Sequence, residues 1–381
     1  MNKEMKKAKV WYEEVEGCTP DDVRNGQVPE LNGYQEIKCH LIFDVKMDFT
    51  RKARYVADGL RTEIPVGLCY SSVVSRDSVR LAFMIAALND LDVFACDIGN
   101  TYLNAPCKEK IWFEAGLECG KDAKGRVMRL TRALYGLKSS GASWRKMFKD
   151  YIESSALGFT ASTTDGDFYY RRNQKPNGEP YYEYLLVYVD DVLAISHDPN
   201  AIMEKISMRF EIKNDEWGPL TRYLGADVEK FTLPDGSTAW SLLSNSYVAA
   251  AVQTVRDLLA EDGRDLKGGK RPHKGPLPSN YQPELDVTDE CDPEHVSRYQ
   301  QLIGILRWAV ELGRIDIHIE VALMSQYQAS PRYGHLEALY LIFHFLWKNP
   351  KKRLVMDPSD PCIDESTFKS GADWESFTRM L

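Results

Sequence analysis

Two adjacent carboxylates, Asp190 and Asp191, lie in the middle of an otherwise almost wholly apolar run at residues 184–196. Burying an unpaired carboxylate costs far more free energy than a typical side-chain contact returns, so this pair needs a compensating positive charge. The run contains no Lys or Arg, and a divalent cation would meet that need. Apolar runs on both sides of a two-residue break predict a β-hairpin with the acids at the turn. An ordinary Asp-Asp turn is the alternative for this segment by itself.

A third acid, Asp97, ends a second short apolar run at residues 93–96. A helix is predicted before it, from Ser75 to Leu88, because Ser75 is a good N-cap and apolar residues follow at helical spacing. Three carboxylates from two strand ends can hold two hard divalent cations, which prefer oxygen ligands. Such a pair of cations clamps the attacking and leaving oxygens of a phosphoryl transfer. Asp97 considered alone would more often be a helix cap or a turn residue.

The segments around these acids follow one another in a characteristic order. They are RKARYVA at 51–57, YSSVV at 70–74, the segment 96–106, LYGLKSS at 134–140, YVDD at 188–191, YLG at 223–225 and YQQLIGIL at 299–306. Together they resemble the reverse transcriptases of copia-type long-terminal-repeat retrotransposons. The resemblance runs from about Gly33 to about Pro350, nearly the whole chain. Each segment alone is unspecific, whereas the full series in the family's order is specific.

The resemblance implies an α+β chain with a right-hand polymerase fold. Its parts would be an antiparallel palm sheet backed by helices, a fingers β-hairpin, and a helical thumb and connection. We expect a polar, loosely ordered lead-in over residues 1–32, fingers and palm over 33–232, and thumb and connection over 233–350. Residues 351–381 would lead toward a ribonuclease H domain, whose own carboxylate cluster we do not expect in this chain.

The implied activity is RNA- and DNA-templated DNA synthesis by two-metal-ion nucleotidyl transfer, carried out by a product of a retrotransposon polyprotein. The resemblance makes Asp97, Asp190 and Asp191 the catalytic residues and, with the carbonyl of Ile98, the ligands of two Mg²⁺ ions, which Mn²⁺ could replace. The implied partners are an RNA or DNA template with its primer, deoxynucleoside triphosphates, and a second copy or other polyprotein products. The implied location is intracellular, in a cytoplasmic virus-like particle, with no membrane contact.

Other residues acquire expected roles from the resemblance. Nucleotide contacts are implied for Lys52, Arg54, Tyr102, Lys138 and Ser139, and primer or template contacts for Tyr188, Tyr223, Leu224 and Gly225. Lys52 and Arg54 share a face of one strand, where they could grip a triphosphate or simply mark a solvated face. Tyr102 would exclude a 2′-hydroxyl, unless it is only a core residue. At Ser139 the chain departs from relatives that usually have Gln, which removes a bidentate hydrogen-bonding amide.

Further elements follow from periodicity. Alternating apolar residues from Ile37 to Val45 predict a half-buried strand. Trp144, Phe148, Tyr151 and Ile152 predict an amphipathic helix that begins at Ser139 or Ser140 and packs behind the sheet. Other helices are predicted from Pro199 to about Phe210, and over 244–262, 299–312 and 335–347.

Composition limits these interpretations. The 381 residues are 44% hydrophobic, enough for a large core and two or three subdomains, and no 18-residue apolar run predicts a membrane helix. The eight cysteines include no Cys-x-x-Cys pair and are expected as reduced thiols. The net charge of −8 is unfavourable for binding phosphates, so a polymerase would need its cations on one face. Candidates for that face are Lys52, Arg54, Lys138, Arg145 and the run 267–274.

A catalytically silent remnant that binds nucleic acid or a protein partner is the alternative, and a two-metal nuclease is disfavoured for lack of a His or Lys near the acids.

Overall fold

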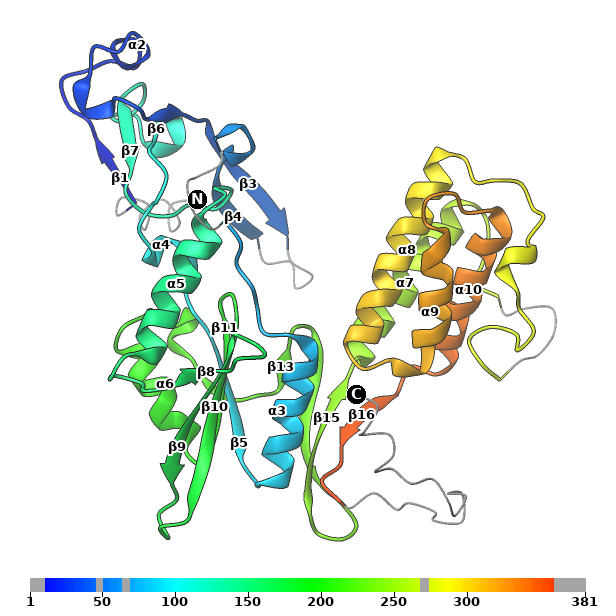
Figure 1. Ribbon diagram of the computed structural model, residues 1–381. Coiled ribbons are helices and arrows are strands. Elements are labelled where there is room, and N and C mark those ends of the chain that lie inside the picture. The colour runs from blue at the N-terminus through cyan, green and yellow to red at the C-terminus, as the bar shows by residue number, and fades with distance from the viewer. Residues whose placement is uncertain (1–10, 46–50, 64–68, 268–273, 360–381) are drawn as a thin grey trace, which may run out of the picture. The chain divides into compact units, whose positions relative to one another are not determined.

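The computed structural model describes residues 11–45, 51–63, 69–267 and 274–359 (Figure 1). The chain divides into two compact units, one made of residues 1–86 and 90–221 and the other of residues 87–89 and 222–381. The boundary predicted after residue 232 therefore falls inside the second unit, at the end of a strand. In the described parts of the chain, no helix is long and apolar enough to cross a membrane.

The first unit contains a six-stranded sheet in which the acid-bearing strands are neighbours. Its strand order is β12-β5-β11-β10-β9-β8, and its pairings are antiparallel. The strands are β5 (Asp92–Asp97), β8 (Thr160–Ala161), β9 (Phe168–Gln174), β10 (Pro180–Tyr188), β11 (Asp191–Ser196) and β12 (Gly218–Pro219). The hairpin predicted over residues 184–196 is thus formed by β10 and β11, with β5 beside β11.

Helices α5 (Ser140–Glu153) and α6 (Pro199–Ser207) pack against this sheet as predicted. Their buried side chains form one core with the sheet; it includes Trp144, Phe148, Ile152, Ile202, Met203, Ile206, Leu185, Val187, Val192 and Ala194. The alternate residues of β11, Leu193 and Ile195, are also buried. Burial on both faces explains why this strand is apolar throughout. The predicted helix before Asp97 is α3 (Arg76–Leu88), and the Ser75 hydroxyl caps it by accepting the Ser78 N–H at 3.1 Å.

A second sheet of the first unit uses residues from the start of the described chain. Its order is β1-β7-β6-β2, formed by β1 (Tyr12–Glu14), β2 (Gln35–Glu36), β6 (Ile111–Glu114) and β7 (Val127–Leu130). Trp11 is buried, with its ring 5.1 Å from that of Tyr55. Helix α2 (Pro20–Arg24) begins with a capping box between Thr19 and Asp22. The expectation of a loosely ordered lead-in is therefore wrong for residues 11–32.

The predicted fingers hairpin is present as β3 (Cys39–Val45) paired with β4 (Arg51–Ala57). The alternating apolar residues do not form a uniformly half-buried face. Ile37 is buried and Leu41 is half-buried, but Phe43 is 68% exposed. Burial therefore falls from Ile37 along β3 to Phe43.

A glycine fixes the base of this hairpin against the segment before α5. The Ala57 N–H donates to the Tyr135 carbonyl at 2.8 Å, and Gly136 follows with a φ of +93°. A Cβ atom on Gly136 would lie 2.1 Å from the Ala57 carbonyl oxygen. Both the positive φ and the close approach require glycine, which explains this residue in the LYGLKSS segment.

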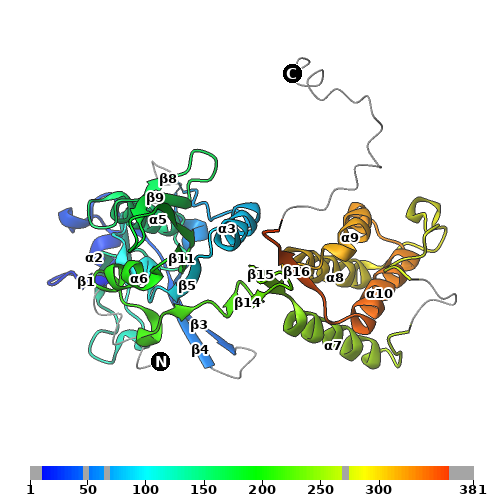
Figure 2. The same ribbon diagram turned by 90° about the horizontal axis from the view of Figure 1, so that it is seen from below.

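The second unit combines a four-stranded antiparallel sheet with a helical bundle (Figure 2). The strands, in the order β13-β14-β15-β16, are Arg222–Tyr223, Ala226–Thr232, Thr238–Leu243 and Arg353–Met356. The helices are α7 (Asn245–Glu261), α8 (Pro293–Glu311), α9 (His318–Met324) and α10 (Tyr333–Lys348). Helices α7, α8 and α10 confirm the three helices predicted in this region. Strand β16 comes from the expected lead-in over 351–381, yet it pairs with β15 and so belongs to this unit.

Candidate active site

The hairpin turn that carries Asp190 has an unusual backbone. Tyr188 pairs with Asp191, so the turn residues are Val189 and Asp190, and Asp191 is already the first residue of β11. Val189 has a φ of +58°, a conformation that is strained for a β-branched residue. The Val189 carbonyl accepts the Trp144 indole N–H at 2.8 Å, and the Asp190 carbonyl accepts the Ile98 N–H at 2.8 Å. These two hydrogen bonds hold the strained turn in place. A strained backbone conformation persists only where the surrounding structure fixes it.

The three predicted acids lie at adjacent strand ends. Asp97 is the last residue of β5, and its Cα is the direct partner of the Asp191 Cα in the antiparallel ladder. Directly opposite residues in such a ladder present their side chains on the same face. The pKa of Asp191 is raised to about 6, mainly by burial and also by the charges of Asp190 and Asp97. The charges of Asp97 and Asp190 therefore act on Asp191.

A lysine also belongs to this group, so the expectation that no His or Lys lies near the acids is wrong. The Lys213 ammonium forms an ion pair with Oδ2 of Asp97, and its charge opposes the rise in the pKa of Asp191. Its position is set by the backbone: Ile212 forms an antiparallel bridge with Ile98, and the Gly99 N–H donates to the Glu211 carbonyl at 2.7 Å. Lys213 and Asp97 are 116 residues apart in the sequence, so the spacing of nearby residues could not have predicted their contact.

The ligand types suit a hard divalent cation, but their present arrangement does not. Among the described residues, no group of three or more Asp, Glu, His or Cys side chains is placed to hold a metal ion. Asp97, Asp190 and Asp191 offer oxygen donors, and one lone pair of the Ile98 carbonyl remains after it accepts the Thr101 hydroxyl at 2.8 Å. The Lys213 ammonium on Asp97 serves as the local cation in this arrangement.

The raised pKa of Asp191 predicts a pH dependence of stability. The ordinary pKa of an Asp is about 3.9, so the folded protein holds this proton more tightly than the unfolded chain does. The stabilisation is complete below pH ~4 and is lost as the pH rises through about 6. In a chelator, the unfolding free energy of Asp191→Asn relative to the unsubstituted protein should rise by about 1–2 kcal/mol between pH 4 and 7. Urea titrations at each pH measure it, and a difference that does not change with pH contradicts it.

Tyr102 lies close to these acids on the short helix α4 (Thr101–Asn104). Its side chain is half-buried, and its ring centre is 4.9 Å from that of Tyr135. Burial raises the pKa of its phenol, and the charge of Asp190 raises it further. Tyr102 therefore packs at the edge of the core while its hydroxyl lies within electrostatic reach of the acid site, so both expected roles fit its position.

Ser139 is not available to a nucleotide in this arrangement. It is buried, and both its N–H and its hydroxyl donate to Oε1 of Glu109, at 2.9 and 2.7 Å. Neighbouring Lys138 donates its ammonium to the Thr62 carbonyl. Glu109 thus fixes the segment ahead of α5, a role that the sequence did not suggest.

The remaining expected cations are only partly placed. Arg54 is half-buried on β4, whereas the Lys52 side chain and residues 268–273 of the basic run lie outside what the structure describes. Arg145 is not free for a ligand, because its Nε donates to the nearly fully buried Asp167 at 2.8 Å. A basic face of this unit would therefore rest on Arg54 and Lys138 rather than on Arg145.

Two expected primer or template segments lie in different units. Tyr188 is half-buried opposite Asp191 in the first unit. Leu224 and Gly225, with φ of +49° and +96°, form the two-residue turn that joins β13 to β14 in the second unit. Positive φ at both turn residues is typical of a type I′ hairpin. Tyr223, the residue directly before this turn, is buried.

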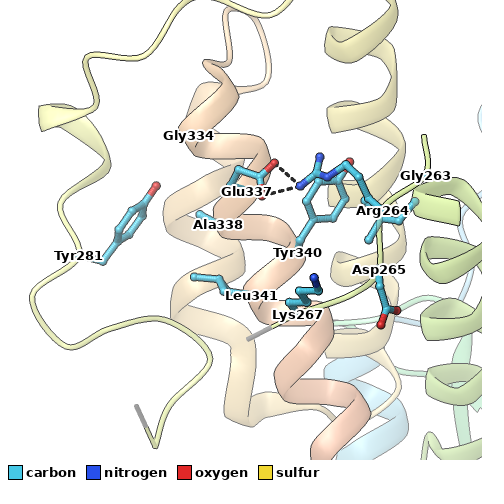
Figure 3. Close-up of a pocket in the computed structure, with 11 residues that line it drawn as sticks. Gly263, Arg264, Asp265, Lys267, Tyr281, Gly334, Glu337, Ala338, Tyr340 and Leu341 are labelled. Carbon is cyan, nitrogen blue, oxygen red and sulfur yellow. Dashed lines mark hydrogen bonds and ion pairs between the residues drawn. The ribbon is translucent and has the colours of Figure 1, made fainter. Parts of the chain in front are cut away.

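The second unit also has a cavity of about 720 Å³ between the end of α7 and α10. Figure 3 shows Arg264 and Glu337 pointing toward each other across it, with Tyr340 beneath the guanidinium. Nη2 of Arg264 lies 2.7 and 2.8 Å from the two carboxylate oxygens of Glu337. The pair joins the segment after α7 to α10 and cancels its own charge, so these two residues give the cavity no preference for an anion.

Residues 28–255 match the family model described as reverse transcriptase (RNA-dependent DNA polymerase), which covers more than half of the chain. The chain belongs to this family. The predicted copia-type reverse transcriptase resemblance and the α+β right-hand polymerase fold are thereby confirmed.

Relatives of this reverse transcriptase occur in plant and yeast transposons. It is 26% identical over 344 residues to the retrovirus-related Pol polyprotein from transposon TNT 1-94 of Nicotiana tabacum, covering 87% of this chain and 24% of that protein. It is 25% identical over 330 residues to the polyprotein from transposon RE1 of Arabidopsis thaliana, covering 85% and 20%. The transposon Ty1-DR6 Gag-Pol polyprotein of Saccharomyces cerevisiae is 24% identical over 356 residues, covering 90% and 19%. The chain thus spans about a fifth to a quarter of the length of these relatives.

A solved structure of a foamy viral protease-reverse transcriptase in complex with double-stranded DNA is also similar. The match has a TM-score of 0.41 and 13% identity, and it covers 83% of this chain and 44% of that one.

Proposed function

We propose that this reverse transcriptase chain itself adds deoxynucleotides to a primer on an RNA or DNA template. The observation that carries the proposal is the grouping of Asp97, Asp190 and Asp191 at neighbouring strand ends, where the charges of Asp97 and Asp190 act on Asp191. In the reaction, the primer 3′-hydroxyl attacks the α-phosphorus of a deoxynucleoside triphosphate and pyrophosphate leaves. The partners are a primed template and deoxynucleoside triphosphates, with a second copy or other polyprotein products, and cytoplasmic virus-like particles are the proposed location.

The three carboxylates would hold two Mg²⁺ ions together with the Ile98 carbonyl. When bound, these ions neutralise charge that develops on the triphosphate. The chain's own contribution is positional: Trp144 and Ile98 fix the carbonyls of the turn, and the β5–β11 ladder holds Asp97 opposite Asp191. Such fixed groups need little rearrangement during the reaction, which is how a site of this kind lowers a barrier.

A primer-extension assay tests the proposal. With poly(rA)/oligo(dT), dTTP and Mg²⁺ or Mn²⁺, the purified chain should lengthen the primer, and EDTA should stop it. A silent remnant is the second candidate, favoured by the engagement of Ser139 with Glu109 and by the net charge of −8. Binding of the primed template without extension would support that candidate and overturn the proposal.

Tyr102 provides a test of nucleotide selection. We propose that its ring blocks a 2′-hydroxyl, since the residue lies on α4 within reach of the charge of Asp190. Tyr102→Ala should raise the use of UTP relative to dTTP by about tenfold or more, while Tyr102→Phe, which keeps the ring, should not. Single-nucleotide extension kinetics measure the ratio. If Tyr102→Ala and the unsubstituted chain use UTP and dTTP in the same ratio, Tyr102 has a purely structural role.

A further inference from the structure

One cation stands out at the acid site because it is held there by backbone pairing. Lys213 lies on the short helical turn η4 (Lys213–Asp215), directly after the Ile212 bridge to Ile98. Ile212 is buried in the core behind the palm sheet, so the position of Lys213 at the end of β5 is set by packing as well as by hydrogen bonding. An exposed lysine on a loose loop would lack both restraints.

The charges around Lys213 explain why it lies where it does. Asp97, Asp190 and Asp191 bring three negative charges to two neighbouring strand ends. Lys213 pairs directly with Asp97, and its charge lowers the pKa of Asp191. The ammonium therefore relieves repulsion among the carboxylates. It also takes up an oxygen of Asp97 that a metal ion would need.

We propose that Lys213 is a built-in counter-ion of Asp97, and that a divalent cation must displace the Lys213 ammonium to bind this carboxylate. The inference rests on the proposed function, in which Asp97 is a metal ligand. It accounts for the observation that the described acids do not yet converge on one point, although their charges interact. Side chains of Lys213 and Asp97 are 47% and 31% exposed, so the ammonium can leave into solvent without a change in the core.

Removing the competing charge should tighten metal binding. Lys213→Met should lower the dissociation constant for Mn²⁺ by about fivefold or more, because fivefold is the factor for two unit charges about 4 Å apart in water and Mn²⁺ carries two charges. Lys213→Arg should bind Mn²⁺ nearly as the unsubstituted chain does, because the charge remains. Lys205→Met, at an exposed position on α6, removes the same net charge away from the site and should leave the affinity unchanged.

The readouts are Mn²⁺ titrations followed by electron paramagnetic resonance, and thermal unfolding with and without Mn²⁺. In a chelator, Lys213→Met should unfold at a lower temperature than the unsubstituted chain, and Mn²⁺ should raise that temperature by more. Unchanged or weaker Mn²⁺ binding by Lys213→Met overturns the inference.

Asp97→Asn separates this inference from the proposed function. If the unsubstituted chain binds Mn²⁺ and Asp97→Asn loses that binding, the proposed metal site stands, and the Lys213 variants alone decide the inference. If Asp97→Asn binds Mn²⁺ as well as the unsubstituted chain does, the metal site itself fails and the inference fails with it.

Discussion

Asp97→Asn should lower the rate of primer extension by about 10³-fold, because it removes a charge from the group that would stabilise the reacting phosphate. The amide keeps the size of the side chain and the pairing of β5 with β11, so the fold should persist. Asp190→Asn should have a similar effect, since Asp190 lies in the strained turn whose carbonyl Ile98 holds. Steady-state extension of oligo(dT) on poly(rA) measures both effects.

Asp191→Asn should be tolerated better than either change. The pKa of Asp191 is raised to about 6, so this carboxylate resists ionisation in the absence of metal, and we expect it to be the weaker ligand. Asp150→Asn is the matched control, because Asp150 pairs only with Lys146 on the exposed side of α5. If Asp97→Asn retains more than about a tenth of the extension rate, Asp97 does not have the proposed role.

The sequence predicted the strands and helices around these acids well where the signals are local. The apolar runs of β5, β10 and β11 are buried strands, and the acids follow or begin them as the pattern indicates. Helix α5 was also predictable, because Trp144 and Phe148 lie on one face and both are buried. Local periodicity suffices in these cases, since one buried face determines the register of each element.

Other features depend on contacts between distant segments, which periodicity does not encode. Lys213 reaches Asp97 only because Ile212 pairs with Ile98, and Trp11 is buried only because β1 pairs with β7. The orientation of Ser139 toward Glu109 is a choice of side-chain direction within a loop. Such interactions form only when the fold brings the partners together. Sequence motifs therefore predict the three acids but not Lys213, Ile212 or Glu109, which contact them or the segments around them.

Glu183→Ala should lower the free energy of unfolding by about 3–5 kcal/mol, because it would leave a largely buried guanidinium without its partner. Glu183 pairs with Arg171 across β9 and β10, with Nε of Arg171 2.5 Å from Oε2 of Glu183. Their side chains are 2% and 19% exposed. Oε1 of Glu183 also accepts the Ser196 hydroxyl at 2.6 Å and the Tyr181 hydroxyl at 3.1 Å. Urea unfolding measures the loss.

Two further variants show whether the loss comes from an unpaired charge. Glu183→Leu with Arg171→Met removes both charges and should recover most of the lost stability, since a buried ion pair is often replaceable by apolar residues of similar volume. Glu179→Ala is the control on the same hairpin, because its pair with Lys175 is exposed and should contribute little. If the double variant is no more stable than Glu183→Ala alone, packing rather than charge explains the loss.

The pH dependence of this effect follows from the same contacts. Burial by itself raises the pKa of Glu183, but hydrogen bonds from Ser196, Asn173 and Arg171 outweigh it and lower the pKa below the usual value. The folded chain therefore binds this proton less tightly than the unfolded chain does, and the stabilisation is present above pH ~4.5 and lost as the pH falls through the lowered pKa. The difference in stability between the unsubstituted chain and Glu183→Ala should accordingly shrink in acid and stay constant from pH 6 to 8. A difference that grows on acidification would mean that Glu183 is held protonated in the fold, with the Arg171 contact no longer an ion pair.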